Sequence, residues 1–253
     1  MPQGSREPVY APVIRVALGA FRALDVDFAI SGAEHVPPTG GGVVVMNHTG
    51  YLDFALAGVP FWKAHRRLVR FMAKDQVFKH PISGPLMRGM KHIPVDREAG
   101  ADSYVAAVAA LRSGELVGVF PEATISQSFE LKEFKNGAAR MALDADVPVV
   151  PLIVWGAQRI WTKDHPRDIG RRKIPVTVAA GPPLPPAGDV EQLDAALLEG
   201  MTSLLHRVQE EYPHPEGAFW VPRRLGGSAP TVAEAKIIED TEKAERARRR
   251  AER

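Results

Sequence analysis

His48 and Asp53, a histidine and an aspartate five residues apart, are suited to acid–base chemistry. They lie in residues 47–53, which read Asn-His-Thr-Gly-Tyr-Leu-Asp and follow the apolar run 43–46. Residues five apart do not share a helix face, so the two side chains can meet only if His48 lies in a turn and Asp53 begins a helix. Asp53 could then hold one imidazole nitrogen and leave the other free as a base. The alternative is a packed histidine beside an aspartate that caps a helix.

The elements that must position this pair follow from the hydrophobic pattern. Apolar runs predict strands over 26–30, 43–46, 68–73, 91–95, 116–120, 148–155 and 174–179. Helical patterns occupy residues 53–65, 101–113, 134–145 and 189–211. A loop is expected around Pro81, Gly84 and Pro85. Strands that alternate with helices predict an α/β fold, in which a mostly parallel central sheet is flanked by helices.

Three chemically useful side chains each follow the end of a predicted strand. His48, Arg97 and Glu122 come after the runs 43–46, 91–95 and 116–120. Parallel strands place their carboxyl ends along one edge of the sheet, where ligands gather. We therefore expect these three residues to line one crevice, although polar residues often follow strands without sharing a site.

The two ends of the chain differ in pattern from the middle. Residues 9–24 form an amphipathic helix that either packs on the domain or lies in a membrane interface. Residues 231–253 are mostly alanine and charged residues, which predicts a solvated helix or a frayed tail whose basic end could touch anionic lipid. We expect an N-terminal amphipathic helix in residues 1–25, one catalytic domain over 26–225 and a charged tail over 226–253.

Composition narrows the function classes. The chain has 253 residues, a formal net charge of +2 and no cysteine. The near-neutral charge gives no reason to expect a nucleic-acid partner, and the missing cysteine excludes disulfides, thiolate metal sites and a thiol nucleophile. No histidines show the paired spacing of a metal site, so we expect no metal and no resident cofactor. Arg15 and Arg22 interrupt the longest nearly apolar stretch, which predicts no membrane-spanning helix.

Four stretches together resemble the ordered sequence blocks of the glycerolipid acyltransferase family, which includes bacterial 1-acylglycerol-3-phosphate acyltransferases. They are residues 47–53, 93–97, 120–126 and 147–152. The resemblance implies transfer of an acyl group from acyl-CoA or acyl carrier protein to a hydroxyl of a lysophospholipid acceptor. It also implies a peripheral protein at the cytoplasmic face of a membrane. By similarity, His48 and Asp53 would be catalytic, and Arg97, Glu122 and Thr124 would bind the acceptor and its phosphate.

This sequence departs from the family's pattern at three positions. Ala123 stands where the third block commonly has glycine, Ile125 where it has arginine, and Gly50 where serine is frequent in the first. Without the arginine the site lacks a bidentate phosphate donor. Arg97 with Lys74 or Lys135 could still hold a phosphate. Otherwise the acceptor is another lysolipid or a glycolipid, or the chain is a relative that binds lipid or acyl-CoA without transferring the acyl group.

The reaction can also be argued from the residues alone. A hydroxyl is a poor nucleophile at neutral pH, so its attack on a thioester requires a base such as His48. Asp53 would orient the imidazole and stabilise the imidazolium, as the aspartate does in a serine triad. No Gly-x-Ser-x-Gly turn occurs in the chain, so the sequence gives no signal for an acyl-serine intermediate. Direct transfer from donor to acceptor is the simpler hypothesis.

Overall fold

The computed structural model of the chain describes residues 7–96 and 100–251. Within them, seven strands form one sheet in the order β1-β7-β6-β2-β5-β3-β4. The strands are β1 (Asp27–Ser31), β2 (Gly42–Met46), β3 (Val69–Lys74), β4 (Ile93–Val95), β5 (Leu116–Val119), β6 (Val149–Trp155) and β7 (Pro175–Ala180). β2, β3, β4, β5 and β6 run parallel, and β7 pairs antiparallel with β6. The predicted mostly parallel α/β sheet is confirmed.

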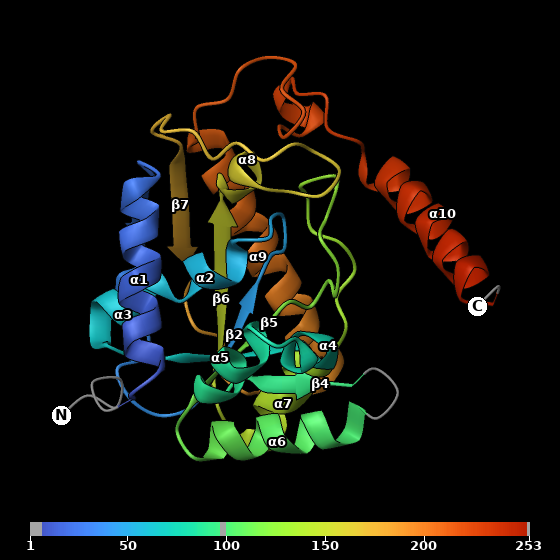
Figure 1. The fold of residues 1–253 in the computed structure, drawn as a ribbon. Coiled ribbons are helices and arrows are strands. Elements are labelled where there is room, and N and C mark those ends of the chain that lie inside the picture. Colours follow the sequence, from blue (N-terminus) through green and yellow to red (C-terminus); the bar gives the residue numbers. More distant parts are fainter. Residues whose placement is uncertain (1–6, 97–99, 252–253) are drawn as a thin grey trace.

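Helices cover both faces of the sheet (Figure 1). On one face lie α1 (Tyr10–Ala23), α2 (Asp53–Ala57) and α3 (Val59–His65). On the other lie α6 (Gly100–Arg112), α7 (Gly137–Ala145) and α9 (Val190–Glu211). The central strand β2 is buried along its whole length, since it packs on both layers. Its side chains alternate, with Val43 and Val45 in one core and Val44 and Met46 in the other.

The N-terminal helix α1 packs on the domain. Phe21 lies in the core beneath the sheet, and the Tyr10 hydroxyl donates to the Val69 carbonyl oxygen at 2.6 Å. The apolar stripe that the sequence predicted is therefore turned towards the protein, where burial of aromatic side chains gives a large hydrophobic contribution. Among the described residues, no helix is both long enough and apolar enough to cross a membrane.

The expected loop around Pro81 is wrong in part, because two short helices, α4 (Asp75–Lys79) and α5 (Ser83–Gly89), occupy this region. Pro85 lies in the first turn of α5, where a backbone N–H would have no partner within the helix. A proline there does not break the helix. The helix predicted over 53–65 is instead two, α2 and α3, which meet at Gly58 and have Pro60 near the start of the second.

The remaining elements are short, except for the last helix. They are η2 (Ala33–His35), α8 (Ala157–Ile160) and η3 (Arg223–Leu225). The last helix, α10 (Val232–Ala251), extends away from the sheet and its covering helices (Figure 1). Of the two structures expected for the C-terminal residues, this is the solvated helix.

Candidate active site

His48 and Asp53 meet directly beyond the carboxyl end of β2. Asp53 is the first residue of α2 and is completely buried, and its Oδ2 lies 3.0 Å from Nδ1 of His48. Since a carboxylate can only accept, this contact keeps the proton on Nδ1 and leaves the lone pair on Nε2. The His48 side chain is 22% exposed, so the imidazole is accessible from the surface. The pair has the geometry of a general base and its orienting carboxylate.

The same carboxylate oxygen also fixes the loop between the two residues. The backbone N–H groups of Thr49 and Gly50 donate to Asp53 Oδ2 at 2.6 and 2.7 Å. Two fixed backbone donors and the imidazole thus share one acceptor. We call residues 47–53 the histidine loop. Within it, residues 48–50 cannot move away from Asp53 without breaking these three contacts.

Asn47 ties the start of the histidine loop to the neighbouring strand. Its buried carboxamide donates to the Val154 carbonyl oxygen at 3.0 Å and accepts from the Val154 N–H at 2.8 Å. The loop is also braced from the segment after β6, where the Thr162 hydroxyl donates to the Thr49 carbonyl oxygen at 2.6 Å. These contacts join β2 to distant parts of the chain, so the position of the imidazole depends on the folded sheet.

Glu122, which follows β5, holds the histidine from the other side. Its Oε1 accepts from the His48 backbone N–H at 3.0 Å, and the Ser126 N–H donates to the His48 carbonyl oxygen at 2.7 Å. The Phe120 ring stacks on the imidazole with a centroid separation of 4.3 Å. Burial raises the pKa of Glu122 to about 8, against the opposing effects of a hydrogen bond from His48 and the charge of Lys132. At neutral pH this carboxyl is therefore largely uncharged.

Two of the departures from the family's pattern have local structural consequences. Ala123 has a left-handed backbone with φ of 59°, a conformation in which glycine carries no steric cost. At Gly50, an added Cβ would come within 2.9 Å of the Trp161 carbonyl oxygen. A serine cannot occupy position 50 here unless the segment after β6 shifts.

The residues predicted to bind substrate lie in different surroundings. Thr124 lies two residues after Glu122, whose carboxyl holds the His48 backbone, and its hydroxyl donates to Glu239 Oε1 of α10 at 2.8 Å. Lys74 ends β3 at the same edge of the sheet and is exposed. Arg97 lies outside the described residues. The roles given to these residues stay predictions.

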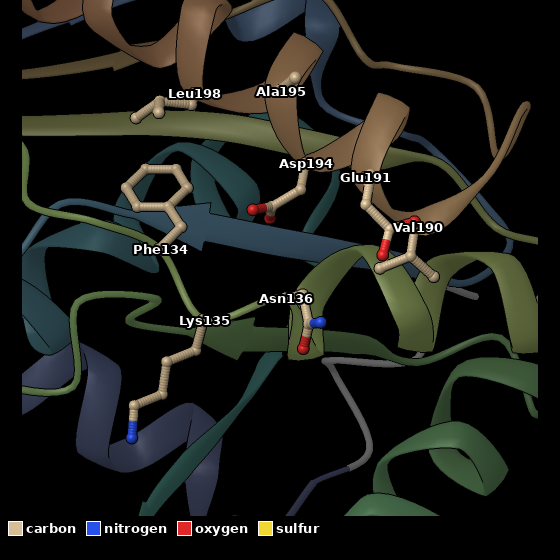
Figure 2. A pocket seen from close by; sticks show the side chains of 8 residues that line it. All are labelled: Phe134, Lys135, Asn136, Val190, Glu191, Asp194, Ala195 and Leu198. Carbon is tan, nitrogen blue, oxygen red and sulfur yellow. The ribbon is translucent and has the colours of Figure 1, made fainter.

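Lys135, the other cation considered for a phosphate, lines a separate cleft between the segment before α7 and the start of α9 (Figure 2). Its side chain points away from the carboxylates of Asp194 and Glu191, which line the same cleft. None of the residues that line this cleft is His48, Asp53 or Glu122. Lys135 thus lines a cleft to which the described catalytic candidates do not contribute, and its role in phosphate binding stays a prediction.

Two residues that sequence reasoning missed lie beside the site. The Lys132 ammonium donates to the Thr124 hydroxyl, and Lys163 lies directly after Thr162, which braces the histidine loop. Both lysines stand in charged stretches that are typical of solvated surface. No pattern in the sequence separates them from the other lysines, since only folding brings Lys132 next to Glu122 and Lys163 next to Glu242 of α10.

Comparison with known proteins places the chain in a family. The family model described as Acyltransferase matches residues 27–155, just over half of the chain. The chain belongs to the acyltransferase family. His48, Asp53, Glu122 and Thr124 all lie within the matched residues of the acyltransferase model.

Individual acyltransferases of known name are similar over part of their length. The chain is 31% identical over 163 residues to a 1-acyl-sn-glycerol-3-phosphate acyltransferase from Limnanthes douglasii, covering 63% of this chain and 55% of that one. It is 29% identical over 141 residues to the enzyme of the same name from Bacillus subtilis, covering 55% of this chain and 68% of that one. The chain thus spans about half the length of the Limnanthes relative.

A solved acyltransferase structure has the same fold. The crystal structure of the 1-acyl-sn-glycerophosphate (LPA) acyltransferase, PlsC, from Thermotoga maritima superposes with a TM-score of 0.67. The match covers 81% of each chain at 22% sequence identity. The helix-flanked sheet is therefore shared well beyond the residues that the family model matches.

Proposed function

We propose that this chain is an O-acyltransferase that moves a fatty acyl group from a thioester donor to a hydroxyl of a lysophosphatidate-type glycerolipid. The observation that carries the proposal is the 3.0 Å contact between His48 Nδ1 and Asp53 Oδ2 beyond the end of β2, in a chain of the acyltransferase family. The similarity to relatives named 1-acyl-sn-glycerol-3-phosphate acyltransferase supports the choice of acceptor.

His48 acts first as base and then as acid. Its Nε2 takes the proton of the acceptor hydroxyl as that oxygen attacks the thioester carbonyl carbon. The tetrahedral intermediate collapses, the C–S bond breaks, and the thiolate leaves with the proton from Nε2. Asp53 stabilises the imidazolium between the two proton transfers. The new ester and a free thiol are the products, and no acyl-enzyme is formed.

The donor and the setting follow from the same proposal. Acyl-CoA or acyl carrier protein supplies the thioester, and the acceptor reaches the chain from the surface of a membrane to which the protein binds peripherally. No resident cofactor takes part, because transfer of an acyl group between a thiol and a hydroxyl needs only proton movements.

Replacement of His48 tests the assignment of the base. General base catalysis contributes about 10²–10⁴-fold, so His48→Ala should lower kcat by at least about 100-fold. Turnover is measured with isotopically labelled acyl-CoA and lysophosphatidate, by mass spectrometry of the lipid product. His65→Ala, at the exposed end of α3, is the matched control and should keep wild-type turnover. A purified, folded His48→Ala protein that kept more than about a third of wild-type turnover would contradict the assignment.

The acceptor is tested with the wild-type protein. A mixed pool of lysophosphatidate, other lysophospholipids and lysoglycolipids is offered with one acyl-CoA, and the products are identified by mass. Preferred acylation of lysophosphatidate is expected. Preferred acylation of a glycolipid would replace the acceptor in the proposal, and stoichiometric acyl-CoA binding without transfer to any acceptor would replace the activity.

A further inference from the structure

A cation lies beside Thr124 and Glu122, in the stretch where this sequence lacks the arginine that its family commonly has. Position 125 is a half-buried isoleucine, but the Lys132 ammonium reaches the hydroxyl of Thr124 in the same turn. The Lys132 side chain is only 17% exposed. Its charge and its backbone N–H both act on Glu122, the carboxyl that holds the backbone of His48. Lys132 is therefore a partly desolvated cation beside Glu122, whose carboxyl in turn contacts the histidine loop.

A second cation completes the cluster from the segment after β6. Lys163 is 19% exposed and follows Thr162, whose hydroxyl donates to the Thr49 carbonyl oxygen. Its ammonium lies 3.9 Å from a carboxylate oxygen of its neighbour Asp164. We call Lys132, Lys163 and the Thr124 hydroxyl the cationic cluster.

The cationic cluster is occupied by two carboxylates of α10. Glu239 accepts from the Thr124 hydroxyl at 2.8 Å and from the Lys132 ammonium at 3.1 Å, and Glu242 pairs with Lys163. Partial burial alone would raise the pKa of Glu239, but hydrogen bonds from Thr124 and Lys132 and the charges of both lysines lower it. Residues three apart share one helix face, so a single face of α10 presents both carboxylates to the cluster.

Little else holds α10 on the protein. Along its described side chains only Ala235 is buried, and the helix extends away from the sheet in Figure 1. Its first turn is stabilised locally, since Thr231 and Glu234 exchange side-chain and backbone hydrogen bonds as a capping box. Its contact at the site is made by ion pairs, which are weak and exchangeable where solvent reaches them.

Glu122 should not repel an anion that binds at the cationic cluster. Because burial raises its pKa to about 8, the carboxyl nearest to Lys132 on the histidine side is mostly neutral at physiological pH. Among the described residues, the carboxylates paired with the two lysines are those of Asp164 and of Glu239 and Glu242 in α10. Removal of α10 would leave two lysines and a hydroxyl facing an incoming anion, a donor set that suits phosphate.

We propose that the cationic cluster binds the phosphate monoester of the acceptor, and that Glu239 and Glu242 occupy this site as an intramolecular substitute until the acceptor displaces α10. The inference rests on the proposed function for the identity of the acceptor. The helix thus competes with the substrate, and the apparent affinity for the acceptor is reduced by the fraction of molecules in which α10 is seated.

Two opposite variants of the full chain test the proposal. Lys132→Met removes the cation but keeps the volume, and should raise KM for lysophosphatidate by about tenfold, the change typical of a lost charge-assisted hydrogen bond. The double variant Glu239→Gln/Glu242→Gln empties the site of competing charge, and should lower that KM by about threefold or more. Neither should change KM for monoacylglycerol, which carries the same chain and hydroxyl but no phosphate.

Matched controls come from the same molecule. Lys63→Met removes an exposed lysine of α3, and Asp240→Asn removes an exposed carboxylate of α10 that pairs within the helix with Lys236. Both should leave KM for the two acceptors unchanged. A gain of affinity in the glutamate double variant cannot arise from misfolding, so this arm stays informative even if the lysine variant folds poorly.

A binding measurement separates this inference from the proposed function. Calorimetric titration of the full chain with glycerol 3-phosphate needs no turnover, and should show weaker binding in Lys132→Met and tighter binding in the glutamate double variant. The inference is overturned if Lys132→Met affects both acceptors equally, or if the double variant binds glycerol 3-phosphate no more tightly than wild type. A chain that transfers no acyl group but shows the expected shifts would overturn the proposed function and keep the anion site.

Discussion

The histidine loop and the proposed anion site at the cationic cluster are held in contrasting ways. Buried, short-range hydrogen bonds fix the histidine loop: three donors reach one oxygen of Asp53, and a carboxamide joins Asn47 to β6. In the cationic cluster, the long side chains of Lys132 and Lys163 pair with α10, whose described side chains include only one that is buried, Ala235. Hydrogen bonds of the first kind are costly to break, whereas partly exposed ion pairs exchange readily.

The difference fits the demands of acyl transfer. A general base works only when its geometry is preorganised, so the imidazole is held on both sides of its backbone and at one ring nitrogen. Recognition of the acceptor instead requires groups that release one anion and take another. The histidine loop is rigid, whereas the ion pairs of the cationic cluster can exchange one anion for another.

The largest expected effect comes from the histidine loop. Asp53→Asn keeps an acceptor for the backbone N–H groups but cannot stabilise the imidazolium, so kcat should fall by about 10²–10⁴-fold. Initial rates with acyl-CoA measure the loss. Asp146→Asn, at the exposed left-handed end of α7, is the control and should leave kcat unchanged. Near-normal turnover of Asp53→Asn would mean that His48 has no need of its proposed orienting group.

Loss of the carboxamide that anchors the histidine loop should be the next largest effect. Asn47→Ala leaves the N–H and carbonyl of Val154 without their side-chain partner, which should lower the free energy of unfolding by about 2–4 kcal/mol. Denaturant titration measures it. Asn136→Ala is the control, because Asn136 is exposed and its side chain caps no helix, so its change should stay within about 0.5 kcal/mol. Equal losses in the two variants would contradict the anchoring role of the Asn47 carboxamide.

Glu122 should make stability depend on pH. Its pKa is about 8 in the folded protein, against 4.5 for the free side chain, so between these values the folded state keeps a proton that the unfolded chain has lost. The free energy of unfolding should therefore fall as pH rises through this window, by at most about 1.4 kcal/mol per pH unit, and level off above about 8. Glu122→Gln still accepts from His48 but cannot ionise. The difference between wild type and variant, measured from pH 5.5 to 8.5, should show this slope; a flat difference would contradict the raised pKa.

The smallest effect concerns the turn at Ala123. Ala123→Gly relieves a left-handed alanine, and after the entropy cost of glycine the free energy of unfolding should rise by about 0.5–1 kcal/mol. Thermal unfolding should shift upwards by about 1–3 °C. Ala109→Gly, at an exposed position inside α6, should shift it downwards. Shifts of the same sign in both variants would show that backbone strain at position 123 is not the cause.

Local patterns predicted the scaffold and the histidine loop. The apolar run before His48 predicted a buried strand, and the five-residue spacing placed Asp53 at the start of a helix, which is where the structure has it. The pattern failed where proline was taken only as a breaker, because Pro85 stands in a first helical turn that tolerates it. It also left open whether the apolar stripe of α1 faces protein or lipid, since the stripe looks the same in both cases.

The sequence by itself predicted the strands, the longer helices and the pairing of His48 with Asp53, because these follow from periodicity and from spacing along the chain. Only the tertiary structure decided that Glu239 pairs with Lys132 and lies within reach of the charge of Lys163. These three residues come from segments after β5, after β6 and in α10, and each is an ordinary surface charge in its own stretch. A charged side chain acquires a specific partner only when the fold fixes the distance and the burial between them, and no local pattern carries either quantity.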